Sequence, residues 1–105
     1  MKELAALQAL AEPHRLGILE LLRDGEQPVG QLVDRLGLSQ PAVSKHLRVL
    51  RDAGLVDARV DAQRRLYRIR PEPLADLDEW LDSYRKLWTT RLDRLEYHLD
   101  QRRKP

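Results

Sequence analysis

The stretch that decides the fold is residues 29–54, which read VGQLVDRLGLSQPAVSKHLRVLRDAG. Leucine and valine recur at helical spacing on both sides of Gly37, so the pattern predicts two short helices with a left-handed glycine between them. Ser39 is placed to cap the second helix, and Pro41 is tolerated in that helix's first turn. Two helices joined in this way predict a helix-turn-helix, whose second, recognition helix covers residues 40–53.

The rest of the chain extends this unit on both sides. Helical spacing predicts a short helix before residue 12 and another that begins at Pro13. Apolar and polar residues alternate after Gly54, which predicts a hairpin of two strands over residues 56–70. Helical spacing then resumes over about residues 74–100. The predicted fold class is mainly α (α+β), a winged helix-turn-helix in the order α-α-α-α-β-β-α that forms a single domain over residues 1–105.

Composition excludes several classes of protein. The 105 residues, of which 42% are hydrophobic and 34% charged, suit one globular domain. The absence of cysteine excludes disulfides, thiolate zinc sites and cysteine catalysis. No run of about 18 uncharged apolar residues occurs, so we expect no membrane insertion. Because the chain has no cysteine, nothing marks it as extracellular, and we expect a cytoplasmic protein. Phosphate-binding glycine loops, catalytic carboxylate pairs and Ser/His/Asp arrangements are missing, so we predict no enzyme activity and no cofactor.

Positive charge is concentrated in the helix-turn-helix and the hairpin. Residues 39–70 carry eight lysines and arginines against three acids, whereas residues 71–84 carry five acids and no base. A basic segment of this kind favours a polyanion as its partner. Double-stranded DNA is the predicted partner, because the second helix of a helix-turn-helix fits the major groove. We interpret His14 and His46 as structural or phosphate-contacting residues rather than as metal ligands.

Several polar and basic side chains are candidates for DNA contact. Gln40, Ser44 and Lys45, at the start of the recognition helix, have the length and chemistry to reach base edges. Arg48 is better placed for a phosphate, and arginines near the hairpin turn suit the minor groove. The predicted DNA-binding residues are Ser39, Gln40, Ser44, Lys45, Arg48, Arg64 and Arg65. The alternative is a winged helix that binds another protein, which would not need this basic face.

Four blocks of sequence carry a family resemblance, namely ALAEPHRLGILELL (9–22), VGQL (29–32), LSQPAVSKHLRVLRDAGLV (38–56) and RRLYRI (64–69). With these blocks the chain resembles the ArsR family of bacterial winged-helix repressors over about residues 3–100. The resemblance implies a homodimeric transcriptional regulator, usually a repressor that an inducer releases from its operator. It also implies that Gln40, Ser44 and Lys45 are the recognition-helix contacts, with Ser39 near a phosphate and Arg64 and Arg65 in the wing. The inducer, whether a small molecule or a partner protein, is unknown.

The chain departs from the metal-sensing members of that family. They carry a Cys-x-Cys pair at the start of the helix before the recognition helix, where this chain reads QPVGQL (27–32). A second family site uses Asp and His pairs on the last helix, and here only Asp93, Glu96 and His98 are available. We therefore predict no metal site. A metal-responsive repressor with its site on the last helix is the alternative.

A seam of apolar side chains runs along the predicted last helix. Leucines and aromatics recur at steps of three and four residues, which is nearly a heptad repeat. A monomer of this size cannot bury the whole seam, so we predict a homodimer through the terminal helices; the alternative is that the helix folds back over its own chain. The predicted interface residues are Leu4, Leu7, Leu77, Leu81, Tyr84, Trp88, Leu92 and Leu95. The acids of residues 72–82 suit the helix dipole, and the sequence assigns them no further role.

Overall fold

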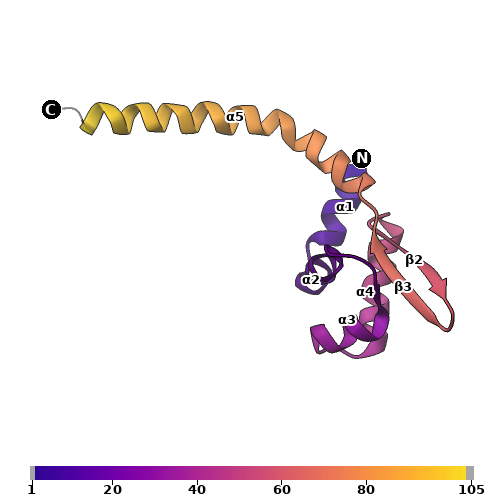
Figure 1. The fold of residues 1–105 in the computed structure, drawn as a ribbon. Coiled ribbons are helices and arrows are strands. Elements are labelled where there is room, and N and C mark those ends of the chain that lie inside the picture. Colours follow the sequence, from indigo (N-terminus) through magenta and orange to yellow (C-terminus); the bar gives the residue numbers. More distant parts are fainter. Residues whose placement is uncertain (1, 104–105) are drawn as a thin grey trace.

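The structure is a computed structural model of the chain and describes residues 2–103. Helices and strands follow one another within this range as drawn in Figure 1. Their bounds are α1 Lys2–Leu10, α2 Pro13–Leu22, β1 Gln27–Pro28, α3 Val29–Leu36, α4 Gln40–Asp52, β2 Val56–Asp61, β3 Arg64–Ile69 and α5 Glu72–Arg103. None of the described helices is long and apolar enough to cross a membrane. The predicted winged helix-turn-helix is confirmed, with one more strand than the sequence indicated.

The turn between α3 and α4 has the left-handed glycine and the serine cap that the sequence predicts. Gly37 follows α3 with a φ of 66°, the left-handed conformation that glycine adopts without a steric cost. The Ser39 side chain accepts a hydrogen bond from the Ala42 backbone N–H at 3.3 Å, which caps α4. Pro28 is the N-cap residue of α3 and is extended, with no side-chain cap hydrogen bond. These groups fix where the recognition helix α4 begins.

The sheet is antiparallel and has the strand order β1-β3-β2. Strands β2 and β3 pair from Val56 opposite Ile69 to Asp61 opposite Arg64, so a two-residue turn closes the hairpin. Ala62 in this turn has a φ of 57°. Strand β1, which the sequence analysis did not predict, pairs Pro28 with Leu66 of β3. Two residues are too few to produce an alternating pattern, and proline is tolerated because β1 lies at the sheet edge.

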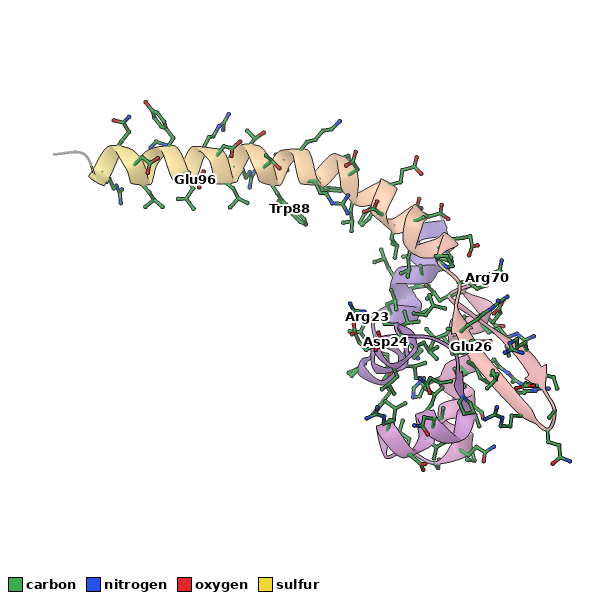
Figure 2. The ribbon with its side chains drawn as sticks, viewed as in Figure 1. Arg23, Asp24, Glu26, Arg70, Trp88 and Glu96 are labelled. Carbon is green, nitrogen blue, oxygen red and sulfur yellow. The ribbon has the colours of Figure 1, made fainter. Side chains whose placement is uncertain are left out.

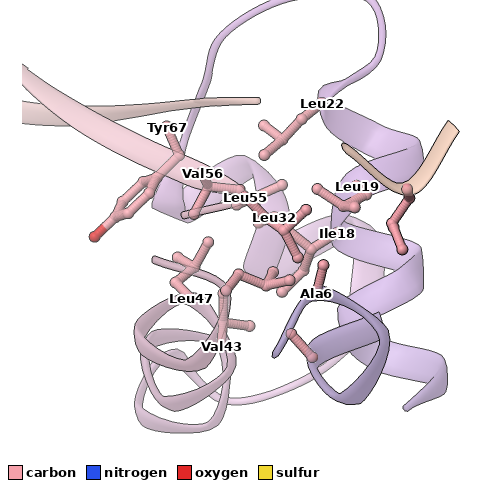
Figure 3. Close-up of a cluster of buried hydrophobic side chains, with 13 residues drawn as sticks. Ala6, Ile18, Leu19, Leu22, Leu32, Val43, Leu47, Leu55, Val56 and Tyr67 are labelled. Atoms are coloured by element: carbon pink, nitrogen blue, oxygen red, sulfur yellow. The ribbon is translucent and has the colours of Figure 1, made fainter. Parts of the chain in front are cut away.

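The core lies between the first four helices and the inner face of the sheet (Figure 3). The largest fully buried side chains come from α2, α3, α4 and the start of β2; they are Ile18, Leu32, Val43, Leu47, Leu50, Leu55 and Val56. All of them are aliphatic, and no charged side chain of the described residues is buried with them. Because α3 and α4 both contribute to this one cluster, their relative orientation is held by hydrophobic packing.

Helix α5 is attached to this body only by its first turns. Leu77 is 8% exposed and belongs to the core, where α1 packs against α5. From Tyr84 onward every described side chain of α5 is exposed, and the helix runs away from the other elements instead of folding back over them (Figure 1). This projection gives the described chain its length of 69 Å, against 29 and 20 Å in the other directions.

Candidate nucleic-acid interface

The recognition helix α4 divides into a buried face and an exposed face. Val43, Leu47 and Leu50 point into the core. Gln40 and Ser44 lie along one edge of this buried stripe and are exposed, as are Ser39, Lys45 and Arg48. The hydrophobic core therefore positions the polar face, because rotation of α4 would expose three aliphatic side chains to water. All the predicted residues of this helix are accessible to a partner.

A hollow of about 660 Å³ separates the exposed face of α4 from the hairpin. It is bounded by the start of α3, the start of α4, the hairpin turn and strand β3. The residues that line it are Pro28, Val29, Gly30, Gln31, Gln40, Ser44, Gln63, Arg64, Arg65 and Tyr67. The structure thus brings four of the predicted DNA-binding residues to one concave surface, two from the helix and two from the hairpin of β2 and β3, which is the wing of the fold.

A second hollow of about 340 Å³ continues along the same helix toward its C-terminal end. The residues that line it are Ser44, Leu47, Arg48, Arg51 and the acidic Asp52 of α4, with Arg65 and Tyr67 of β3. Ser44 and Arg65 border both hollows, so they lie where the two meet. Ser39 and Lys45 are exposed but border neither hollow.

Ion pairs neutralise much of the positive charge on the hairpin. The Arg68 guanidinium donates two hydrogen bonds to the Asp57 carboxylate, at 2.7 and 3.4 Å. Arg59 donates two to Glu26, at 2.7 and 2.9 Å. The sequence predicts concentrated positive charge on the hairpin. This prediction is only partly correct, because nearby carboxylates pair with two of the hairpin arginines.

These pairs also perturb the carboxylates. The hydrogen bond from Arg68 lowers the pKa of Asp57 below its ordinary value and outweighs the opposing effect of burial. The hydrogen bond from Arg59 acts on Glu26 in the same way and lowers its pKa. Both carboxylates therefore stay ionised and hold their arginines at neutral pH.

The remaining cations on this surface are available to an external anion. Arg64 is 3.4 Å from Asp61, a long contact between half-exposed side chains. Among the described residues, no carboxylate lies within ion-pair distance of Lys45, Arg48, Arg51 or Arg65. Three of these four cations, Arg48, Arg51 and Arg65, border the second hollow, so positive charge without an ion-pair partner is concentrated there.

Some of the residues that shape this surface were missing from the sequence-based set. Gln31 of α3 and Gln63 of the hairpin turn both line the larger hollow. Gln63 was detectable, because the predicted hairpin turn included it. Gln31 gave no such signal, because its position depends on how α3 packs beside β3.

The family model described as "Bacterial regulatory protein, arsR family" matches residues 12–58, which include the whole helix-turn-helix. The HTH-type transcriptional regulator Rv2034 of Mycobacterium tuberculosis is 45% identical over 87 residues, which are 83% of this chain and 78% of that protein. The chain belongs to the ArsR family. A second relative of this ArsR-family chain, the biofilm growth-associated repressor of Agrobacterium fabrum, is 43% identical over 71% of the chain and 64% of its own length.

Solved structures agree with this assignment. A crystal structure of a possible transcriptional regulator for arsenical resistance is 43% identical, covers 89% of this chain and 94% of its own, and has a TM-score of 0.70. HlyU from Vibrio cholerae is 42% identical, covers 79% and 91%, and has a TM-score of 0.66. The ArsR-family chain is accordingly a bacterial transcriptional regulator with a DNA-binding winged helix, and not an enzyme.

Proposed function

We propose that this ArsR-family protein is a dimeric repressor that recognises an inverted-repeat operator, with α4 in the major groove and the wing at the minor groove. The observation that carries the proposal is the hollow between α4 and the wing, which Gln40, Ser44, Arg64 and Arg65 line together. The major groove of B-DNA, about 12 Å wide, admits one α-helix. DNA that receives α4 in this groove meets the wing at the same time.

Side chains in the first two turns of α4 would contact the DNA bases. Gln40 is able to hydrogen-bond an adenine at two positions, Lys45 suits guanine, and Ser44 suits a base or a phosphate. Ser39, at the N-cap, lies beside the backbone N–H groups of the first turn, which favour a phosphate. Because the core holds the buried face of α4, the rotation of the helix is fixed and with it the direction of these side chains.

The cations that form no ion pair with a carboxylate of the described residues would bind the DNA phosphates. Arg48 borders the second hollow beside Arg51 and Arg65, and such cations attract the DNA backbone and release its counterions. Arg64 and Arg65, next to the hairpin turn, are the side chains placed for the adjacent minor groove. A regulator that binds the bacterial chromosome in this way works in the cytoplasm.

Dimerisation would use the exposed seam of α5. Trp88 is 57% exposed and projects from a part of the helix that has no described neighbour (Figure 2), and Leu92 is 63% exposed. Exposed apolar area of this extent is unusual for a monomer and favours a second copy of the chain. Leu4 and Leu7 are also exposed, on the helix α1 that packs against α5, and would add to this interface. Leu77 is buried in its own chain, so the proposed interface begins beyond it.

A two-fold dimer of this kind matches an operator with two half-sites. Its recognition helices would enter successive major grooves, about 34 Å apart along the DNA. The relative from Agrobacterium fabrum is named a repressor, which supports repression for this chain as well. The wing and helix of each copy would then contact one half-site.

The test begins with selection of bound sequences from a random DNA library, followed by fluorescence anisotropy on the selected site. We expect the selected site to be an inverted repeat that binds about a thousandfold more tightly than random DNA. Gln40→Ala should lose about 1–3 kcal/mol of this discrimination. Gln101→Ala, at the far end of α5, is the matched control and should bind as the parent does. Failure to enrich any sequence would exclude the proposal and favour a protein-binding winged helix.

A further inference from the structure

One cluster of polar side chains lies outside the DNA-binding surface. Glu12, His14 and His46 bring a carboxylate oxygen and two imidazole nitrogens within 4.8 Å of one another. It is the one group of three or more metal-ligating side chains with this spacing among the described residues. We infer that these residues form a binding site for a divalent transition-metal ion of the zinc class, which links the start of α2 to the recognition helix α4.

The folding of the chain brings these residues together from two separate segments. Glu12 precedes α2, and its carboxylate accepts the Arg15 backbone N–H at 2.9 Å, which makes it the N-cap. His14 follows two residues later, in the first turn of α2. His46 comes from the middle of α4, and its ring centroid lies 5.5 Å from that of His14. A helix cap needs only the glutamate, so capping does not account for the two histidines beside it.

The spacing of the donor atoms suits a small tetrahedral ion. Nδ1 of His14 lies 2.9 Å from one Glu12 oxygen, and Nδ1 of His46 lies 3.7 Å from the other. Zinc bonds of about 2.0–2.2 Å place neighbouring ligand atoms about 3.4 Å apart in a tetrahedron. The three donor atoms, one from each residue, lie within 4.8 Å of one another, so side-chain rotation has to bring them to this spacing around one ion.

The donor set also agrees with this chemistry. Two imidazoles and one carboxylate are borderline ligands that zinc and its first-row neighbours accept, whereas magnesium prefers oxygen ligands throughout. Burial raises the pKa of Glu12. The hydrogen bonds from the Arg15 N–H and from His14, together with the nearby His46, lower it by more, so the pKa of Glu12 is below its ordinary value. No lysine or arginine of the described residues forms an ion pair with this carboxylate.

The surroundings leave room for an ion to enter from solvent. The His14 side chain is 47% exposed, whereas those of Glu12 and His46 are 25% and 20% exposed. Three protein ligands leave a fourth position for water, which is the pattern of an exchangeable site and not of a closed structural one. The neighbouring Arg15 is directed elsewhere, because its guanidinium donates to the backbone carbonyls of Gln8 and Ala9.

The site lies beside the DNA-binding face without being part of it. His46 and Ser44 are two residues apart on α4, which separates them by about 200° around the helix. An ion at His46 therefore does not compete with DNA for space. It joins α2 to α4 from the side opposite the exposed polar face.

Zinc titration of the untagged, full-length protein in the absence of DNA tests this inference independently of the proposed function. We expect one Zn²⁺ per chain by competition with a chromophoric chelator, and no binding of Mg²⁺. His14→Gln and Glu12→Gln should each weaken zinc binding by at least about tenfold. Glu12→Gln keeps an acceptor oxygen for the Arg15 N–H, and circular dichroism checks that both variants fold.

His98→Gln is the matched control, because His98 is the third histidine of the chain and lies on α5. This variant should bind zinc as the parent does. Absence of zinc binding by the parent protein would overturn the inference. So would binding that His98→Gln abolishes while His14→Gln leaves it intact, since the ion would then be held by the last helix.

Discussion

Replacing Arg65 by alanine should weaken operator binding and reduce its salt dependence, whereas replacing Arg68 should change the salt dependence little. Both arginines belong to β3, only three residues apart. Arg65 borders both hollows and forms no ion pair with a carboxylate of the described residues. Arg68 donates two hydrogen bonds to Asp57, so its charge is already balanced within the hairpin.

The expected size of the effect follows from the number of phosphates lost. Each neutralised phosphate contributes about −0.9 to the slope of log K against log salt concentration. One Arg65 in each copy of a dimer gives two contacts, so the slope should become less steep by about 1.8. Taking about 1 M salt as the reference, the same relation gives a loss of about 30-fold, or about 2 kcal/mol, at about 0.15 M salt.

Fluorescence anisotropy on the selected operator, repeated over a range of salt concentrations, measures both quantities. Arg68→Ala is the paired control because it removes the same side chain from the same strand. The reasoning fails if Arg65→Ala leaves the slope unchanged, or if Arg68→Ala reduces it equally. Either result would mean that ion pairing inside the hairpin does not decide which arginines meet DNA.

Further predictions concern stability and assembly. Leu32→Ala removes a fully buried side chain and should cost about 3 kcal/mol in urea unfolding; a loss below about 1 kcal/mol would contradict the described packing. Ser39→Ala removes the α4 cap and should cost about 1 kcal/mol in the same assay, whereas no loss would dismiss the cap. Leu92→Glu should convert a dimer into a monomer in sedimentation equilibrium, and an unchanged mass would refute the α5 interface. Glu26 and Asp57 have lowered pKa values in the folded protein because Arg59 and Arg68 donate hydrogen bonds to them. Their contribution to stability is therefore complete above their ordinary pKa values of about 4.5 and 3.8, and it is lost as the pH falls below these toward the lowered pKa values of the folded state. The double variant Glu26→Gln/Asp57→Asn should show a smaller loss of stability in acid, measured by circular dichroism, than the parent; an equal loss would refute this.

The helices were predictable because their signals are local. Gly37 needs only its own backbone freedom to end α3, and Ser39 needs only the next three residues to cap α4. The apolar spacing in residues 40–53 likewise fixes which face of the recognition helix is buried, so the exposed candidates on α4 followed from it.

Other features depend on pairing between distant residues, which the sequence pattern does not encode. Strand β1 exists because Pro28 meets Leu66. Arg59 loses its free charge to Glu26, which lies 33 residues earlier in the chain. Counting charges along the sequence treats every arginine as available, whereas the folded hairpin selects among them.

The cluster at the start of α2 illustrates the same limit. His14 and His46, taken singly, were interpreted as structural or phosphate-contacting. The two histidines come close together only when α2 and α4 pack against each other. Neither residue alone suggests a metal site, whereas together with Glu12 they form a group of candidate ligands.

The projecting helix α5 has a mechanical consequence. At about 1.5 Å per residue, its 32 residues span about 48 Å, and only the first turns are fastened to the DNA-reading body. A tilt of about 10° at one end therefore displaces the other end by about 8 Å, which is more than two base-pair steps of DNA at about 3.4 Å each. In a dimer joined through α5, a small change in the angle between α5 and the DNA-binding body would move the two recognition helices away from the spacing of successive major grooves.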